Sequence, residues 1–401
     1  MTRIIANPAV ACKGGLLPSI MIGVVRPTHV LLVFGTRPEA IKLCPVLLHM
    51  RQRPEQFAVE ACVTGQHRGM LDQVLAAFQV TPEYDLDVMR PGQSLAQSSA
   101  RILSQLEPVL AEARPDMVLV QGDTTSTLCG ALGAFYRGIP VGHVEAGLRT
   151  GDLQEPFPEE MNRVVTTRLA HLHFAPTPLA AERLAAENVP CERIFVTGNS
   201  GIDAVLYIRD ALESGASPAP AWEQLDASKR LVVVTAHRRE SFGEGFERIC
   251  RALARLAERH DVQIAYPVHR NPSVMEPVYR LLGDRPNVLL LDPLDYVPFV
   301  DLMRRAALIL TDSGGIQEEG PSLGKPILVM REKTERPEAV EAGTVRLVGT
   351  SEETIVREAC LLLDSEGERR RMSRVHNPYG DGQASRRIAD AIAAHRAEGL
   401  R

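Results

Sequence analysis

The fold class of this chain is decided by the stretch Ala307-Leu308-Ile309-Leu310-Thr311-Asp312-Ser313-Gly314-Gly315-Ile316-Gln317-Glu318-Glu319. Its first five residues form a short apolar run, which predicts a buried strand. The Ser-Gly-Gly turn then leads into a helix. Glycines let a phosphate approach the backbone N–H groups at a helix start, so the turn indicates an anion site. A tight strand-to-helix turn without a ligand is the alternative interpretation.

The same alternation of short apolar runs and longer helical stretches extends outward along the chain. The predicted strands are Val30–Phe34, Val59–Thr64, Met117–Gln121, Ile139–Val144, His173–Ala175, Ile194–Val196, Leu231–Thr235, Gln263–Val268, Val288–Leu291, Ala307–Thr311 and Pro326–Met330. Near-continuous apolar strands separated by helices indicate parallel sheets covered on both faces. The sequence therefore predicts an α/β protein of two Rossmann-like, doubly wound domains facing a cleft.

A loop-rich stretch separates the two series of strands. Residues 214–228 include Gly-Ala-Ser-Pro-Ala-Pro, and we expect the domain boundary between Gly198 and Ser228. The first strand begins near His29, while the apolar run before it is interrupted by Lys13, two glycines and Pro18. Because that run makes a poor signal peptide, residues 1–26 are expected to form an N-terminal extension outside the fold.

Bulk properties narrow the class of protein. A chain of 401 residues with 45% hydrophobic residues suits two domains, and a net charge of −5 argues against a nucleic-acid partner. The seven cysteines are scattered, which argues against disulfides and a zinc site. The sequence lacks a membrane-length apolar run, a Walker A motif and a GxGxxG after the first strand. We therefore expect a cytoplasmic enzyme without a cofactor, metal or membrane.

Charged side chains follow the strands of the first half. Thr36 and Glu39 fit a capping box, which places Arg37 at a helix start and Lys42 within reach of the same anion. A solvated helix start is the alternative. Asp123 follows a buried strand, either as a carboxylate in the cleft or as a helix N-cap.

Two further carboxylates come next along the chain. Glu145 ends a strand, and Glu159 lies on a proline-rich loop that enters a helix, where Glu160 can serve the helix dipole. Together with Asp123 they predict a cleft with several acid/base groups.

In the second half of the chain, basic side chains follow the predicted strands. His237-Arg238-Arg239 directly follows a strand and favours an anion site, and His269-Arg270 repeats this pattern less densely. Arg336 follows the next strand after the Ser-Gly-Gly turn. Glu319, one helical turn beyond Gly315, is placed to accept hydrogen bonds from ribose hydroxyls.

These motifs occur together and in a fixed order. They are Phe-Gly-Thr-Arg-Pro-Glu-Ala-Ile-Lys, Gly-Asp-Thr-Thr, His-Val-Glu-Ala-Gly-Leu-Arg-Thr, Pro-Glu-Glu-x-Asn-Arg, His-Arg-Arg-Glu-Ser and Asp-Ser-Gly-Gly-Ile-Gln-Glu-Glu. From about His29 to the last helix, the chain resembles the bacterial non-hydrolysing UDP-N-acetylglucosamine 2-epimerases. The set of motifs is specific, whereas each motif alone is not.

The resemblance implies the glycosyltransferase-B fold. Residues 27–200 would then carry the catalytic carboxylates, residues 201–376 would bind UDP, and residues 377–401 would form a helix crossing back to the first domain. It also implies reversible conversion of UDP-N-acetylglucosamine (UDP-GlcNAc) to UDP-N-acetylmannosamine (UDP-ManNAc) in a homodimer. The product would supply N-acetylmannosamine units for bacterial surface polysaccharide.

The resemblance also assigns residues. Those implied to contact substrate are Arg37, Lys42, Asp123, Glu145, His237, Phe299, Ser313, Gly314, Gly315, Glu319 and Arg336, and those implied in catalysis are Asp123, Glu145, Glu159 and His237. An allosteric site for a second UDP-GlcNAc as activator is implied at Gln66, Gln93, Arg239 and His269. Two positions depart from the pattern of relatives: Leu294 replaces a Gln that contacts uracil, and Gly92 replaces an Arg.

The chemistry explains why several acid/base groups are needed. The C2 proton is not beside a carbonyl, so its removal is coupled to loss of UDP from C1, which gives a glycal. Inversion then requires a group on the other face of C2 to return a proton. A glycosyltransferase of the same fold, a hydrolysing epimerase and a non-catalytic nucleotide-sugar sensor remain alternatives.

Overall fold

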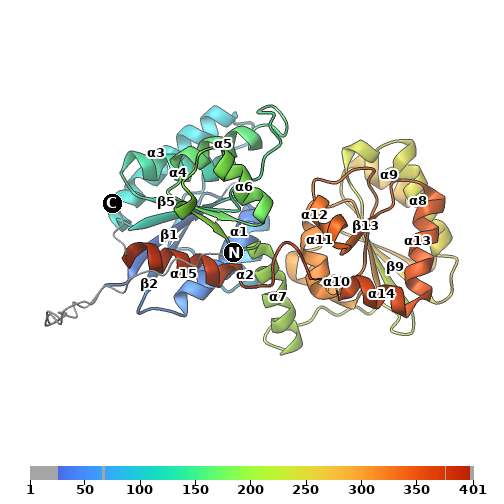
Figure 1. Ribbon diagram of the computed structural model, residues 1–401. Helices are drawn as coiled ribbons and strands as arrows, with labels where there is room; N and C mark the ends of the chain where they lie inside the picture. The colour runs from blue at the N-terminus through green and yellow to red at the C-terminus, as the bar shows by residue number, and fades with distance from the viewer. Residues whose placement is uncertain (1–25, 66–67, 375, 398–401) are drawn as a thin grey trace, which may run out of the picture.

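The computed structural model describes residues 26–65, 68–374 and 376–397, which fold into two α/β units lying side by side (Figure 1). The predicted extension at residues 1–26 lies outside the described residues except for Arg26. That residue forms an ion pair with Asp116 at 2.6 Å.

The first unit is built on a parallel sheet. Within the described residues this sheet has seven strands in the order β3-β2-β1-β4-β5-β6-β7. They are β1 (Thr28–Phe34), β2 (Phe57–Val63), β3 (Tyr84–Asp85), β4 (Met117–Gln121), β5 (Val141–Val144), β6 (Leu172–Ala175) and β7 (Ile194–Val196). Its helices are α1 (Arg37–Arg51), α2 (Arg68–Ala77), α3 (Leu95–Ala113), α4 (Thr125–Tyr136), α5 (Glu159–Leu169), α6 (Pro178–Ala186) and α7 (Ser200–Glu213), with a short 3₁₀ turn at Cys191–Arg193.

The second unit repeats this plan. In the part of the chain that the structure describes, its six strands run in the order β10-β9-β8-β11-β12-β13. They are β8 (Arg230–Thr235), β9 (Val262–Pro267), β10 (Val288–Leu291), β11 (Leu308–Thr311), β12 (Ile327–Val329) and β13 (Val345–Leu347). Its helices are α8 (Glu244–Leu256), α9 (Pro272–Leu282), α10 (Tyr296–Arg305), α11 (Gly314–Glu319), α12 (Pro337–Ala342), α13 (Glu352–Asp364) and α14 (Glu366–Ser373), with 3₁₀ turns at Arg239–Ser241 and Gly320–Leu323. The last helix of the chain is α15 (Ala384–Ala397).

The strand order reverses once in each sheet, between β1 and β4 and between β8 and β11. In open parallel sheets, ligands bind beyond the carboxyl ends of the strands at such a reversal. The four turns at these points begin at Gly35, Gly122, Ala236 and Asp312. They are four of the turns that the sequence singled out, and the prediction of two doubly wound α/β units is confirmed.

The strands form because their apolar residues are buried on both faces. Every residue of β4 and of β11 is buried, as helices on each side require. The bounds of β4, β7 and β10 are as predicted. The sequence missed β3 and β13, which lie at sheet edges and contain only two and three residues. Such short edge strands leave little periodic signal.

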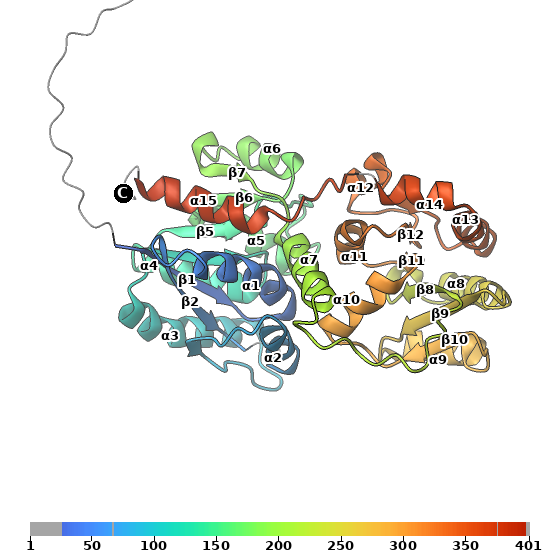
Figure 2. The same cartoon turned by 90° about the horizontal axis from the view of Figure 1, so that it is seen from below.

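The last helix crosses back from the second unit to the first (Figure 2). It packs against α1 and α7, and the buried Asp203 of α7 accepts hydrogen bonds from the backbone N–H groups of Ala384 and Ser385 at 3.2 and 2.8 Å. These bonds satisfy donors at the start of α15 and so fix where the helix docks. The domain boundaries given above remain predictions. No helix among residues 26–65, 68–374 and 376–397 is long and apolar enough to span a membrane.

Candidate active site between the two units

A cavity of about 1200 Å³ lies between the two units. Its lining from the first unit includes Lys42, Asp123, Glu145 and Glu159, and from the second unit Arg238 and Thr334–Pro337. The structure thus brings five of the residues singled out from sequence, Lys42, Asp123, Glu145, Glu159 and Arg336, to one cavity. Asp123, Glu145 and Glu159 come from the first unit together with Lys42, and the second unit contributes Arg238 and Arg336.

Asp123 lies in the turn after β4 and does not cap the next helix. The N-cap of α4 is Thr124, whose hydroxyl accepts a hydrogen bond from the Thr127 N–H at 3.1 Å. The Asp123 carboxylate instead pairs with Arg163 at 2.6 Å, and its backbone carbonyl accepts from the Asn162 amide at 2.8 Å. Burial raises the pKa of Asp123 above its usual value despite the opposing charge of Arg163. The N-cap interpretation of Asp123 is therefore wrong.

Glu145 has an unusual backbone as well as two side-chain partners. Its φ of +64° lies in the left-handed region that residues other than glycine seldom adopt. One carboxylate oxygen accepts from the Lys42 ammonium and the other from the side-chain amide of Gln121. Strained backbone that is held by specific contacts clusters at functional sites, which supports a chemical role for Glu145.

Glu159 is the first residue of α5 and lines the cavity. Its charge contributes to the raised pKa of Asp123, which places the two carboxylates near each other. The neighbouring Glu160 does more than serve the helix dipole. It is buried, accepts the N–H groups of Thr150 and Gly151 at 3.0 Å each, and lies 3.2 Å from Arg163.

Glu39 joins the turns after β1 and β4. Its carboxylate accepts the N–H groups of Gly35 and Thr36 at 3.0 and 2.7 Å, and the hydroxyls of Thr124 and Thr127 at 2.8 and 3.1 Å. The start of α1, the helix that carries Lys42, and the turn that carries Asp123 are therefore held together by one buried side chain.

The glycine turn of the second unit faces two arginines. A Cβ added to Gly314 would lie 3.7 Å from a terminal nitrogen of Arg336 and 3.9 Å from one of Arg238. The Ser313 N–H donates to the hydroxyl of Thr311 at 3.0 Å. Because the Ser313 N–H already has a partner, we expect the two arginines and the N–H groups of Gly314 and Gly315 to contact the diphosphate more than the Ser313 N–H does.

Neither Arg37 of the first unit nor Phe299 of the second is among the residues that line this cavity. Arg37 starts α1, and its positive charge opposes the rise in the pKa of both Glu319 and Tyr296, so it lies near these two residues of the second unit. Phe299 on α10 packs against the apolar core, as does Leu294 just before that helix. An apolar residue at 294 is thus accommodated by packing.

Burial and the neighbouring Glu318 raise the pKa of Glu319 to about 8, from a usual value of 4.5. Lys42 and Arg37 oppose this shift. Because the folded protein holds a proton here that the unfolded chain releases, stability falls as pH rises from about 4.5 to about 8.

We expect Glu319→Gln to reduce this fall in stability with rising pH. Between about pH 5.5 and about pH 8.5, the Tm of the nucleotide-free wild type should fall relative to that of the variant by on the order of 5 °C. Thermal denaturation of both proteins across this range measures the difference. Parallel Tm profiles would contradict the assignment.

His237 lies at the start of the turn after β8. Its N–H and that of Arg238 donate to the buried carboxylate of Asp312 at 2.6 and 2.7 Å, which ties this turn to the one after β11. The rings of His237 and His269 stack with their centroids 5.4 Å apart. Burial lowers the pKa of His237 below its usual value, against the charge of Asp312.

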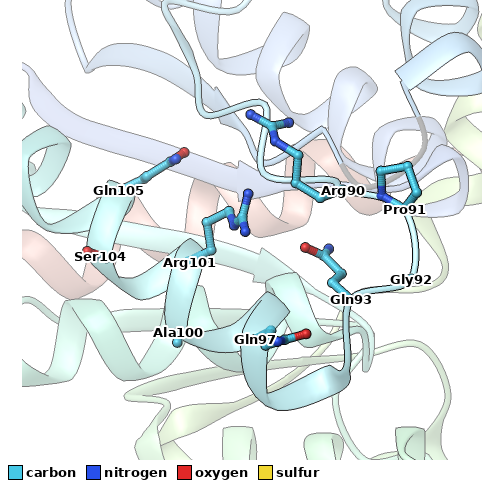
Figure 3. A pocket seen from close by; sticks show the side chains of 9 residues that line it. All are labelled: Arg90, Pro91, Gly92, Gln93, Gln97, Ala100, Arg101, Ser104 and Gln105. Atoms are coloured by element: carbon cyan, nitrogen blue, oxygen red, sulfur yellow. The ribbon is translucent and has the colours of Figure 1, made fainter.

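The residues expected at an activator site are only partly brought together. Gln66 lies outside the described residues. Gln93 lines a separate open cavity of about 660 Å³ with Arg90 and Arg101 (Figure 3). Gly92 belongs to the same loop, with a φ of +71°. The other two residues, Arg239 and His269, follow β8 and β9 in the second unit. The activator site therefore stays a prediction.

Sequence reasoning missed the partners of the carboxylates. Gln121, Glu160 and Arg163 hold Glu145, the Thr150–Gly151 turn and Asp123 respectively. A weak signal existed, because Glu160 and Arg163 are spaced for pairing on one helix face. Within the described residues, no group of three or more histidine, cysteine, aspartate or glutamate side chains is arranged to hold a metal ion.

Comparison with known proteins identifies close relatives. A family model described as UDP-N-acetylglucosamine 2-epimerase matches residues 49–393. The UDP-N-acetylglucosamine 2-epimerases of Salmonella typhimurium and Escherichia coli K12 are 59% and 58% identical over 372 residues, covering 92% of this chain and 99% of each relative. A crystal structure of UDP-GlcNAc 2-epimerase from Neisseria meningitidis bound to UDP-GlcNAc is 45% identical with a TM-score of 0.82, covering 92% of this chain and all of that one.

Proposed function

Because this chain belongs to the bacterial non-hydrolysing UDP-N-acetylglucosamine 2-epimerase family, we propose that it interconverts UDP-GlcNAc and UDP-ManNAc through elimination and re-addition of UDP. It is an isomerase with the glycosyltransferase-B fold. One observation carries the proposed mechanism: Asp123, Glu145 and Glu159 line the same cavity as Lys42 and Arg336. Acid/base groups and cations then meet around a single bound substrate.

The carboxylates carry the proton. One of them takes the C2 proton while the C1–O bond breaks with its electron pair going to UDP, which leaves a C1–C2 double bond in 2-acetamidoglucal. In the return step a UDP oxygen adds to C1, and an acid on the opposite face delivers a proton to C2. Burial raises the pKa of Asp123 above its usual value, which favours this carboxyl as a group that takes up and returns a proton in the cycle.

The cations balance the charge that grows on the leaving diphosphate. Lys42 and Arg336 line the cavity, and Arg238 lies beside the Gly314 turn. Arg37 and His237 lie on the turns after β1 and β8. Donors fixed in a cavity before the reaction lower the barrier because they need no reorganisation as charge develops. Ser313, Gly314, Gly315, Glu319 and Phe299 would hold the nucleotide on the second unit.

The finer assignments follow from the same family membership. We propose a homodimer, a second UDP-GlcNAc as activator, and a product that supplies N-acetylmannosamine units for surface polysaccharide. The stacking of His269 on His237 supports the activator, because it would connect that site to a substrate residue. The free cysteines among the described residues support a reducing, cytoplasmic location.

Incubation with UDP-GlcNAc as the sole substrate tests the proposal. We expect ¹H and ³¹P NMR to show UDP-ManNAc growing to a constant ratio with the substrate. The Glu145→Gln variant at equal concentration is the control for a contaminating activity. Free N-acetylmannosamine with UDP would instead indicate a hydrolysing enzyme. No change in the presence of folded protein that binds UDP would indicate a transferase or a sensor.

A further inference from the structure

Glu318 is a buried carboxylate for which the proposed chemistry has no use. It lies on α11, directly before Glu319, and is 5% exposed. A buried carboxylate is costly unless each oxygen has a partner. The identity of its partners therefore indicates what the residue does.

The two carboxylate oxygens of Glu318 face different parts of the molecule. One accepts from Nε of Arg336, which lines the substrate cavity. The other accepts from the side-chain amide of Asn199 at 2.7 Å. One side chain thus joins a cavity cation to a residue at the end of the first unit.

Asn199 is held firmly where the chain first crosses between the units. It is the N-cap of α7, where its side-chain oxygen accepts the Gly201 N–H at 2.8 Å. Its own N–H donates to the carbonyl of Tyr379 at 2.7 Å, in the segment that returns to α15. Helix α7 packs against α11, and the segment that returns to α15 passes close to both (Figure 2). Through Asn199 and Asn377, Glu318 contacts both crossing segments.

Asn377 anchors the backbone of Glu318 independently of its carboxylate. The Asn377 amide donates to the Glu318 carbonyl and to the Ser322 hydroxyl, each at 2.7 Å. The position of α11 at the junction is therefore fixed without the side chain. This leaves the ion pair with Arg336 as the distinct contribution of the carboxylate.

The Arg336 guanidinium is oriented by this pair. Glu318 is the main cause of a pKa of Arg336 above its usual value. With Nε engaged, one terminal nitrogen lies toward the Gly314 turn, 3.7 Å from where a Cβ would be. A planar guanidinium held at Nε presents its remaining donors in a fixed direction.

We propose that Glu318 is a positioning residue that aims Arg336 at the diphosphate and makes this contact depend on the start of α7 through Asn199. The inference rests on the proposed function, which assigns Arg336 to the diphosphate. Binding of UDP then favours the arrangement of the two units in which the Asn199–Glu318–Arg336 chain is intact. Glu318 contacts no substrate in this account.

The test compares UDP affinity, by calorimetry, in Glu318→Gln, Arg336→Gln and the double variant. We expect each single change to raise the Kd about tenfold or more. The double variant should bind within about twofold of Arg336→Gln alone, because both changes remove one interaction. Independent effects that multiply in the double variant would overturn the proposal.

Two asparagine variants separate positioning from folding. Asn199→Ala should raise the Kd about three- to fivefold in the wild type and not at all in Glu318→Gln. Asn377→Ala loses the hydrogen bonds to the Glu318 carbonyl, the Ser322 hydroxyl and the Tyr379 N–H but leaves the Glu318 carboxylate and its two partners in place, so it should bind UDP within about twofold of the wild type. A larger loss in Asn377→Ala than in Asn199→Ala would indicate a structural role alone and overturn the proposal.

The outcomes also distinguish failure of the proposed function of Arg336 from failure of the proposed role of Glu318. If Arg336→Gln binds UDP normally, the assignment of Arg336 to the diphosphate fails, and the role of Glu318 fails with it. If Arg336→Gln binds weakly while Glu318→Gln binds normally, only the role of Glu318 fails. Tm values of all variants verify that the proteins compared are folded.

Discussion

Replacing Asp123, Glu145 or Glu159 by the corresponding amide is expected to lower kcat by about two to four orders of magnitude while UDP still binds. The amides keep the shape of each side chain but cannot exchange a proton with C2. All three carboxylates line the cavity, and the nucleotide is expected mainly on the second unit. Steady-state rates with UDP-GlcNAc, together with UDP binding by calorimetry, measure both effects.

A matched control is available at the same cavity. Glu155 is an exposed carboxylate in its lining, for which the mechanism has no role. We expect Glu155→Gln to keep kcat within about threefold of the wild type, as for other surface changes. Near-normal turnover in all three amide variants would show that other groups move the proton.

The second large effect is expected on stability. Arg163→Met should lower the Tm by on the order of 10 °C, because breaking a buried ion pair by removing one partner costs about 3–5 kcal/mol. Arg163 is 12% exposed at its side chain and pairs with Glu160, which is 1% exposed, as well as with Asp123. The change leaves a buried carboxylate without its cation.

The same variant should also alter the active site. Arg163 opposes the rise in the pKa of Asp123, so its removal should raise that pKa further. Arg168→Met is the control, since Arg168 is an exposed arginine on the same helix. Thermal denaturation should place Arg168→Met within about 2 °C of the wild type. Similar Tm values for both variants would contradict the role given to the buried pair.

Much of the architecture could be predicted because short stretches of sequence determine it. Buried strands such as β4 and β11 are continuous apolar runs, and their carboxyl ends carry the polar turns. The placement of Asp123 and Gly314 after these strands therefore pointed to the cleft. Two short edge strands, β3 and β13, escaped this reasoning, although β7, an edge strand of the same length as β13, was predicted.

The side-chain partners within the site could not be predicted from short stretches of sequence, because the paired residues are far apart along the chain. Asn199 and Glu318 are 119 residues apart, and Lys42 and Glu145 are 103 apart. The distinction between an N-cap and a cleft carboxylate at Asp123 depended on Arg163, 40 residues further along. Such pairings arise only when the turns at the two strand reversals are brought together by the fold.

The claim that most needs a direct test is that cleft carboxylates exchange the C2 proton during reversible loss of UDP. Reaction of UDP-GlcNAc in D₂O, followed by NMR of the sugar ring, measures this at one atom. We expect deuterium at C2 of the UDP-ManNAc formed and, on approach to equilibrium, at C2 of the recovered UDP-GlcNAc. UDP-ManNAc that retains its C2 hydrogen would contradict the account.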